Sequence, residues 1–557
     1  FDIDHGTDVS ISVDGMPVNM VSHAHGQGYA DLHFLIPETV ELIDFGKGPY
    51  YADRGNFTTA GYVGFETKDK LENSMINVEV GQFNTFRTAG LFNVLDKNNH
   101  NAYIATEYIN TDGPFESPQN FNRVNFFGKY TGRIANNDKL SISASHFQSK
   151  WDASGQVPQR AVDQGLITRF GAIDDTEGGN TSRTNLNLVY SKTLDDHSYI
   201  RNRIYYSEYD FELFSNFTFF LEDPINGDQI RQYEDRQLFG LESVWNHEKD
   251  LGMANSLVRI GVGYRNDLSK DNQLSRTLNR KETLERIRFG DINEKNIYGF
   301  ASAEFDFDRL SVEGALRWDY FNFNYTSNLT TLYDPQVQSN NVFSPKLNFI
   351  YNVSRGVQLF WKSGIGFHSN DTRVVLEQNV ADALPLAYGS DLGVSFKPMK
   401  RMFVDAALWY LFLEQEFVYV GDAGIVEPSG KTSRSGIELN LRYQVTDGLF
   451  FRSDFNYTYA RSIEDPEGQN FIPLAPDLTA TAGLFYKKGK FNASFNNRFL
   501  KDRPANEDGS ITAEGYLISD LAANYTFNKV NVGFAIDNLF NQEWNEAQFA
   551  TESRLRN

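Results

Sequence analysis

The dominant pattern along this chain is an alternation of apolar and polar residues with a period of two. In 530–537, Val, Val, Phe and Ile alternate with Asn, Gly, Ala and Asp, and segments 310–320 and 437–443 repeat the pattern. Successive side chains of a β-strand point to opposite faces. The pattern therefore predicts strands with one apolar face and one polar or charged face.

The alternating segments are long and numerous from Met75 onward. Globular strands average about 5–6 residues, whereas a strand that crosses a bilayer needs about 9–11. Most of the segments found here have about ten residues or more, which favours membrane-spanning strands. The twenty-one predicted strands are 75–82, 85–95, 100–111, 122–134, 140–152, 182–191, 198–212, 231–246, 256–268, 291–305, 310–324, 342–351, 357–367, 387–396, 402–420, 432–443, 449–462, 478–486, 491–500, 514–525 and 530–540.

Short and long connections alternate between these strands. Short ones, such as 136–138 and 487–490, are rich in turn-forming residues. The long ones are 153–181, 213–230, 269–290, 325–341, 368–386, 463–477 and 501–513. Short periplasmic turns and long extracellular loops are typical of outer-membrane barrels. The sequence thus predicts an all-β membrane protein, an antiparallel transmembrane β-barrel of about 22 strands.

The number of predicted strands is odd, which implies that one further strand closes the barrel. Bacterial single-chain barrels have even strand numbers, and an unpaired strand edge is costly in lipid. We therefore expect residues 71–557 to form the barrel with one closing strand still to follow Asn557. The chain also begins at Phe1 without a signal peptide, which we interpret as a processed or partial chain.

Composition agrees with a barrel. The mean hydropathy is −0.46, and no run of about 18 apolar residues predicts a membrane helix. Aromatic residues make up 14%, including 28 Tyr and 46 Phe, as expected for the girdles at the two rims of a barrel. A β-rich secreted protein is the alternative on composition alone. The net charge of −21 argues against a nucleic-acid partner, and the lack of cysteine excludes thiolate chemistry.

Residues 1–70 follow a different pattern, with brief alternation and many glycines. Short strands are expected at 9–12, 40–44 and 62–66, and Asp14-Gly15 is a hairpin signal. We interpret 1–70 as a small mixed domain, and the lumen of a barrel of about 22 strands is wide enough to enclose it.

A series of motifs in this region resembles the plug domain of TonB-dependent outer-membrane receptors. The motifs are Ile11–Asn19, Pro37–Glu38, Val40–Ile43, Gly48–Ala52, Gly55–Phe57 and Ala60–Thr67, and at the other end Tyr516–Asn545 resembles the last conserved strand region of the family. The resemblance implies a plug inside the lumen at 1–70. The family's plug starts earlier and follows a short energy-coupling box, so we expect the N-terminal part of the plug to be missing from this sequence.

The resemblance also implies two plug loops that face the extracellular substrate site. The first would hold His5 and Asp8, and the second His23, His25, Gln27 and Tyr29. These six residues are the predicted substrate contacts. Imidazole is a ligand for Zn, Cu, Ni and Fe, so His23 and His25 are candidate metal ligands. The alternative role for these side chains is hydrogen bonding that holds the glycine-rich loops in place.

Other polar residues suggest structural roles. We find no nucleophile with a nearby base, so no enzyme activity and no intrinsic cofactor are expected. Acidic loop residues such as Asp174, Asp175 and Glu177 are expected to be solvated, and bridging of divalent cations to lipopolysaccharide is the alternative. The lumen-facing charges are expected to pair with each other or with the plug; they include Glu313, Arg317, Glu438 and Arg442.

The predicted function is import of a scarce nutrient across the bacterial outer membrane. The resemblance implies a metal chelate such as a ferric siderophore as the substrate, and TonB with its inner-membrane complex as the energy-coupling partner. Outer-membrane lipid and lipopolysaccharide would surround the barrel. The alternatives are a passive porin and a non-transporting barrel subunit of an envelope assembly.

Overall fold

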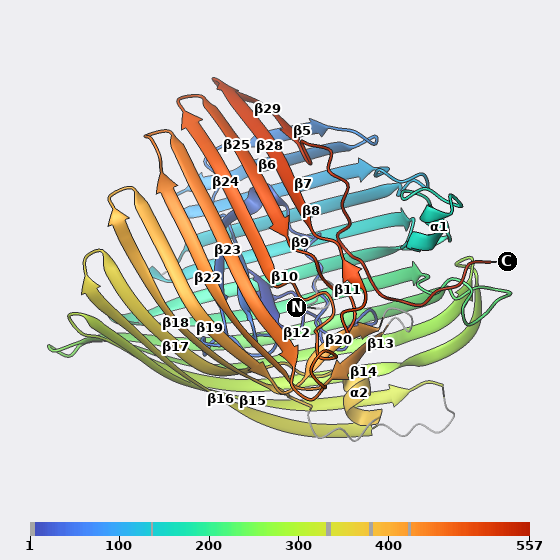
Figure 1. Ribbon diagram of the computed structural model, residues 1–557. Helices are drawn as coiled ribbons and strands as arrows, with labels where there is room; N and C mark the ends of the chain where they lie inside the picture. The colour runs from blue at the N-terminus through green and yellow to red at the C-terminus, as the bar shows by residue number, and fades with distance from the viewer. Residues whose placement is uncertain (1–5, 135–136, 330–335, 378–382, 421–424, 557) are drawn as a thin grey trace.

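A single β-sheet of twenty-one strands dominates the computed structural model and rolls into a barrel (Figure 1). The structure describes residues 6–134, 137–329, 336–377, 383–420 and 425–556. Its barrel strands are β5 (Met75–Val80), β6 (Phe86–Lys97), β7 (His100–Thr111), β8 (Phe121–Arg133), β9 (Lys139–Ala153), β10 (Glu177–Asp195), β11 (Ser198–Ser215), β12 (Ile230–Asp250), β13 (Asn255–Leu278), β14 (Glu282–Asp306), β15 (Leu310–Ser327), β16 (Gln336–Ser354), β17 (Val357–Phe367), β18 (Leu386–Met399), β19 (Met402–Leu413), β22 (Thr432–Gln444), β23 (Leu449–Ser462), β24 (Leu478–Lys488), β25 (Phe491–Leu500), β28 (Tyr516–Phe527) and β29 (Val530–Ile536).

Each barrel strand pairs antiparallel with the next, and β29 returns to lie beside β5. Every one of these strands overlaps one of the twenty-one that the alternation predicts, so the fold class is confirmed. Two predictions of detail are wrong. Residues 269–290 are not a long loop, because β13 and β14 continue to Leu278 and from Glu282. Residues 402–420 are not one strand, because β19 ends at Leu413 and β20 (Glu416–Val420) pairs instead with β21 (Ile425–Ser429).

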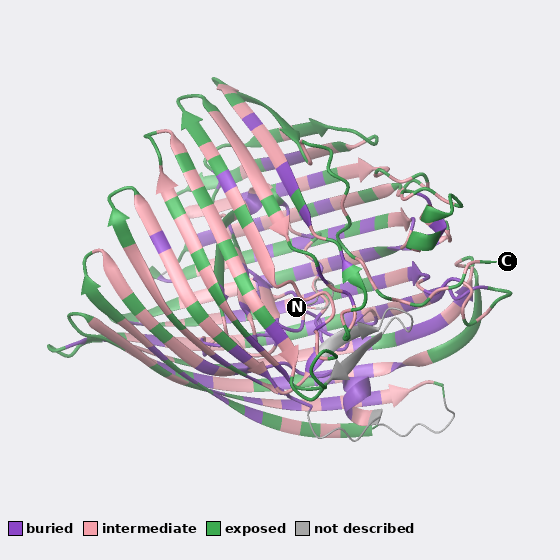
Figure 2. Ribbon diagram, viewed as in Figure 1, coloured by how far each residue is buried: buried purple, intermediate pink, exposed green. Residues whose placement is uncertain are grey.

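The two faces of the sheet differ in burial, as the alternation requires (Figure 2). On β11, Arg203, Tyr205 and Ser207 are buried against the interior, whereas Ile204 between them is 50% exposed on the outside. Outward apolar residues of this kind recur around the barrel and include Ile104, Leu186, Leu241, Leu316, Leu408 and Leu439. They form the apolar surface that a membrane-spanning barrel needs.

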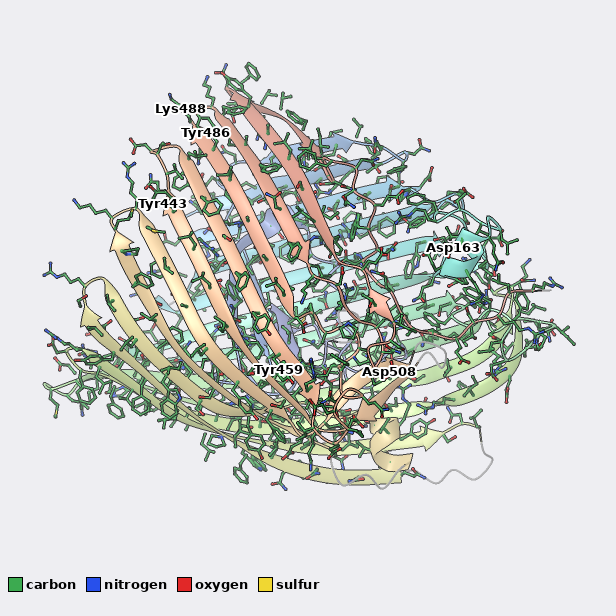
Figure 3. All side chains as sticks on the ribbon, in the orientation of Figure 1. Asp163, Tyr443, Tyr459, Tyr486, Lys488 and Asp508 are labelled. Carbon is green, nitrogen blue, oxygen red and sulfur yellow. The ribbon has the colours of Figure 1, made fainter. Side chains whose placement is uncertain are left out.

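The connections are sorted between the two ends of the barrel. At one end every hairpin is short, the longest running from 134 to 138. At the other end lie longer connections, including 154–176 with helix α1 (Gln159–Asp163), and 501–515 with β26 (Arg503–Pro504) and β27 (Thr512–Ala513). In Figure 3, Tyr443, Tyr486 and Lys488 mark the short-turn end, and Asp163 and Asp508 mark the long-connection end. This sorting matches the predicted one.

Residues 9–67 form a separate four-stranded sheet inside the barrel (Figure 1). Its strands are β1 (Val9–Val13), β2 (Met16–Pro17), β3 (Val40–Lys47) and β4 (Gly61–Thr67), in the order β2-β1-β4-β3. A short 3-10 helix, Pro37–Thr39, precedes β3. The hairpin between β1 and β2 turns at Asp14 and Gly15, which both have positive φ, as the Asp-Gly signal predicts. We call residues 6–70 the plug.

The charged residues that were predicted to face the lumen have partners in the structure. Glu313 pairs with Arg259, and Arg442 pairs with Asp454. Arg317 pairs with Asp319 and also donates to the carbonyl of Ala52 in the plug. Glu438 pairs with Lys47 of the plug. The lumen charges therefore partner each other and the plug, as expected for a polar barrel interior.

Candidate functional site

The second predicted plug loop lies in contact with the barrel wall and with one long connection. We call residues 19–29 the apex loop. Asn19 organises its base, since its side-chain oxygen accepts from the Ile11 amide and its Nδ2 donates to the carbonyls of Gly6, Val9 and Gly28. Backbone bonds from Met20 to Tyr29 and from Gly28 to Met20 close the loop. At Gly28 (φ 79°) a side chain would collide with Gly6, so this close approach requires glycine.

Barrel side chains bind the main chain of the apex loop. Arg236 of β12 donates to the Ser22 carbonyl over 3.3 Å. The Ala24 amide donates to Glu234 over 3.0 Å. Glu234 and Arg236 also pair with each other at 2.7 Å, and both are buried. A buried charge pair that is further hydrogen-bonded to a loop backbone holds that loop in one position.

A segment of the connection between β17 and β18 holds the apex loop from the long-connection end. We call residues 368–373 the clamp segment; it leads into helix α2 (Thr372–Glu377). The Thr372 amide donates to the Ser22 hydroxyl over 2.8 Å, and Arg373 donates to the His23 carbonyl over 2.8 Å. The Gln27 side-chain amide donates to the Ser369 carbonyl over 2.7 Å. The clamp segment therefore links the apex loop to an outer connection of the barrel.

His23 is fully buried at the centre of this junction. Its ring stacks on Tyr29 with centroids 4.4 Å apart and meets the edge of Phe211 at 4.6 Å. Nδ1 accepts from the His25 amide, and Nε2 lies 3.5 Å from Glu234. Burial, followed by the nearby positive charge of Arg236, lowers the pKa of His23 well below its ordinary value. His23 is therefore neutral at physiological pH.

The other predicted residues lie around this junction. His25 and Tyr29 are half-buried, and His25 Nδ1 lies 2.8 Å from the Gln232 side-chain oxygen. Gln27 is buried and holds the Ser22 amide as well as Ser369. Asp8 is buried, and its carboxylate accepts from the Thr59 hydroxyl. His5 lies outside the described residues. The structure thus brings His23, His25, Gln27 and Tyr29 together, and Asp8 apart from them.

The barrel half of this junction was not found from the sequence. It consists of Glu234, Arg236, Asn272, Glu294, Ser369, Thr372 and Arg373. The clamp segment has a weak sequence signal, since His-Ser-Asn-Asp-Thr-Arg follows the apolar strand β17 without a break. Nothing in that run indicates which residues it meets.

A second charge cluster holds the plug against β6, β7 and β8. Arg87 binds both carboxylate oxygens of Glu38 at 2.7 Å and also contacts Glu107. Glu107 accepts from Arg123 over 2.7 Å. Burial alone would raise the pKa of Glu38, but the hydrogen bonds from Arg87 outweigh it and lower that pKa. Glu38 is therefore an ionised anchor of the plug.

The described residues do not form a ready-made site for a bare metal ion. No group of three or more His, Cys, Asp or Glu side chains in the described part of the chain lies in an arrangement that would hold one. His23 and His25 contact Glu234 and Gln232 rather than converging on a common point. A metal that reaches this region would have to bring ligands of its own.

Comparison with known proteins supplies the family context. The family model described as TonB dependent receptor-like, beta-barrel matches residues 122–539. No curated protein matches the sequence. Among the described residues, no helix has the length and apolar character needed to cross a membrane.

Solved structures of similar shape are receptors and transporters. The ferric citrate transporter FecA in its unliganded form has a TM-score of 0.84 and 15% identity, covering 98% of this chain and 85% of that one. The siderophore receptor PiuA from Acinetobacter baumannii has a TM-score of 0.77 and 14% identity, over 96% and 85%. The copper transporter OprC has a TM-score of 0.75 and 14% identity, over 96% and 85%. Likeness at this identity establishes the fold.

Proposed function

This chain belongs to the family of TonB-dependent receptors, and from that membership we propose that it imports a metal chelate, such as a ferric siderophore, with energy delivered through TonB. The family acts in nutrient uptake at the bacterial outer membrane. Ferric citrate, siderophores and copper are the cargoes of the similar structures, which supports a metal-bearing substrate.

The observation that carries this proposal is the attachment of the apex loop to the clamp segment. The apex loop belongs to the plug, and the clamp segment belongs to an outer connection. A substrate that binds from outside and shifts that connection would change the same hydrogen bonds that hold the plug. Substrate occupancy and plug position are thereby coupled through Ser22, His23 and Gln27.

Import requires the plug to move, because it occupies the lumen. The force would come from the inner-membrane complex through TonB, and the change in the plug is an order-to-disorder or displacement step. The contacts that must break include polar ones. Among them are the bonds from Arg236 and Arg373 to the apex loop and the ion pairs of Glu38 and Lys47.

The predicted substrate residues take different parts in this scheme. His25 and Tyr29 are half-buried and can meet a substrate without rearrangement. His23, Gln27 and Asp8 are buried and would reach it only after the apex loop or the plug shifts. His5 and the metal contact by His23 and His25 stay predictions.

The test is uptake of radiolabelled iron, copper, zinc and nickel chelates by cells that lack their own receptors and express this protein, with and without TonB. We expect saturable uptake of at least one chelate that disappears without TonB. Uptake that is unchanged without TonB would contradict the energy coupling, and failure to take up any chelate would contradict the substrate class. A His23→Ala/His25→Ala variant tests the two histidines in the same assay.

A further inference from the structure

The short turns at one end of the barrel carry an excess of positive charge along one part of the rim. Five successive turns between β16 and β29 hold eight Lys or Arg residues and a single carboxylate, Asp447. We call these turns the basic arc; they are 354–357, 397–401, 444–449, 487–490 and 528–529. A cluster of one charge sign on a surface attracts partners of the opposite sign.

The preceding part of the same rim has the opposite charge. We call the turns 193–198, 248–254 and 304–309, which join strands from β10 to β15, the acidic arc. Asp and Glu outnumber Lys and Arg in each of them. Because the strands follow each other around the barrel in chain order, the two arcs lie on different parts of its circumference.

The basic arc is one continuous surface. Main-chain hydrogen bonds of 2.7–2.9 Å join each of its turns to the next turn along the rim. The donors Lys397, Gln444, Lys487 and Thr526 pair in that order with the carbonyls of Gly356, Arg401, Gly448 and Lys490. The charged side chains therefore project from neighbouring turns that are fixed relative to each other.

Most cations of the basic arc have no carboxylate partner among the described residues. Arg401 pairs with Asp447. The other seven are exposed and form no such pair in the described part of the chain; they are Arg355, Lys397, Lys400, Lys529 and the three lysines of 487–490. Their counter-charge has to come from outside the protein.

Exposed aromatic rings lie beside these cations on the outside of the barrel. Tyr525 and Phe527 are 4.4 Å apart between ring centroids, and Figure 3 shows Tyr486 and Lys488 together at this end. Such rings mark the level of the lipid headgroups in outer-membrane barrels. The rings that are 36–58% exposed next to the basic arc are Tyr351, Tyr486, Phe491, Tyr525 and Phe527.

The register of β24 directs a lysine of the basic arc toward lipid. Leu484 and Tyr486 are exposed on the outer side, and Lys488 follows them with the same period of two. Lys488 is also paired in register with the exposed Phe491 of β25. A lysine at the end of a membrane strand extends its ammonium group to the headgroup level.

We propose that the basic arc binds anionic phospholipids of the periplasmic leaflet, with its Lys and Arg side chains on the lipid phosphates and its aromatic rings against the lipid glycerol and acyl chains. The short turns of such barrels are on the periplasmic side. Exposed rings such as Phe305 and Phe307 also adjoin the acidic arc, where the carboxylates repel the same headgroups. The lipids around the barrel are thereby sorted by charge, whatever the barrel imports.

A pair of reporters on opposite arcs tests this lipid site. The chain has no cysteine, so one introduced cysteine carries the only label. Met399 of the basic arc and Met253 of the acidic arc are 52% and 78% exposed. The full chain with Met399→Cys or Met253→Cys carries a fluorophore there and is reconstituted in phosphatidylcholine vesicles. Quenching by nitroxide-labelled phosphatidylglycerol is compared with quenching by nitroxide-labelled phosphatidylcholine.

At Met399 we expect phosphatidylglycerol to be preferred over phosphatidylcholine by about tenfold or more, since each nearby basic residue contributes about fivefold. At Met253 we expect no preference or the reverse. High salt should reduce the preference at Met399, because exposed charges are screened.

Neutralised variants identify the cations responsible. Lys397→Gln/Lys400→Gln, on the two sides of Met399, should reduce the preference there by about fivefold or more. Lys249→Gln/Arg309→Gln is the matched control, because it removes the same charge from two exposed residues of the acidic arc. It should leave the preference at Met399 unchanged. Heat-modifiable migration in gels establishes that each variant is a folded barrel.

Three results would overturn the proposal. They are equal quenching by the two lipids at Met399, an equal preference for phosphatidylglycerol at Met399 and Met253, and a preference at Met399 that Lys397→Gln/Lys400→Gln leaves intact. Equal quenching at Met399 would leave the basic arc as a surface for an acidic periplasmic protein instead.

Discussion

Main-chain groups of the apex loop make several of its hydrogen bonds to the barrel. The carbonyls of Ser22 and His23 and the amide of Ala24 bind Arg236, Arg373 and Glu234. Backbone groups are present whatever the sequence, so these contacts recognise the shape of the loop. The positive φ of Ser22 is part of that shape.

Replacing Arg373 with Met should loosen the apex loop. The change removes the donor to the His23 carbonyl and the partner of Asp371, leaving polar groups buried without bonds. Such a loss costs about 1–3 kcal/mol. Amide hydrogen exchange over residues 19–29 should therefore become at least several-fold faster. Arg401→Met, at an exposed ion pair on a short turn, is the control, and equal exchange in both variants would contradict the role of Arg373.

Acidification should loosen the same loop through His23. When the apex loop is released from the barrel, His23 has its ordinary pKa near 6.5. When the loop is docked on the barrel, the pKa of His23 is lower. Below about pH 6.5 the released loop therefore binds more protons than the docked loop. The docked state therefore loses stability as pH falls through that range, by at most about 1.4 kcal/mol per pH unit. The charged or titratable groups around the ring are Arg236, His25, Arg373, Asp31 and Glu234.

Hydrogen exchange of residues 19–29, corrected for the intrinsic pH dependence, checks this expectation between about pH 7.5 and about pH 5.5. In the wild type, protection of residues 19–29 against exchange should fall as the pH is lowered. In a folded His23→Phe variant, protection should depend less on pH. Identical profiles would assign the pH response to other groups, such as His368, whose pKa burial lowers to about 4.

At the scale of elements, a strand is recognisable from sequence only where its two faces meet different surroundings. On β11, Ile204 faces outward while Arg203 and Tyr205 face the plug, so alternation is clear. Residues 269–290 lack it, because β13 and β14 extend past the barrel rim and polar side chains fill both faces. The hydrogen-bond ladder continues there without a hydrophobic signal. Residues 416–420, which the sequence predicts as part of the preceding strand, leave the barrel and pair locally with β21.

An arginine at Ile204 should destabilise the barrel. Ile204 lies in the outward apolar surface about midway along the membrane-crossing part of β11. A charged residue on the lipid face costs about 2–4 kcal/mol near the bilayer midplane. Urea unfolding in lipid vesicles measures the change. Ile204→Leu is the size-matched control, and a difference of under about 1 kcal/mol between the variants would contradict lipid contact at this position.

At the scale of the whole molecule, the plug is joined to the barrel on several sides. Glu38 is bound to Arg87, Lys47 to Glu438, and the apex loop to β12 and the clamp segment. These ion pairs and hydrogen bonds join the plug to strands that are far apart around the barrel. A plug held at several points closes the lumen more securely than one held by a single hinge.

Removal of residues 1–70 should open the lumen. In planar lipid bilayers we expect the whole chain to show no stable large conductance and the truncated chain to form persistent open pores. The truncated protein must first pass the heat-modifiability test for a folded barrel. Stable large pores from the whole chain would favour the porin alternative, because the plug would then leave a passage open.

The sequence by itself determined the barrel, its twenty-one strands, the sorting of its connections and the site of the plug motifs. These properties follow from local rules, since period-two alternation and turn residues act between near neighbours. It also drew attention to the apex loop, through its histidines. Only the tertiary structure decided that His23 is buried against Glu234 and that Arg373 holds its carbonyl. Those partners come from strands and connections hundreds of residues away, and closure of the sheet around the plug is what brings them together.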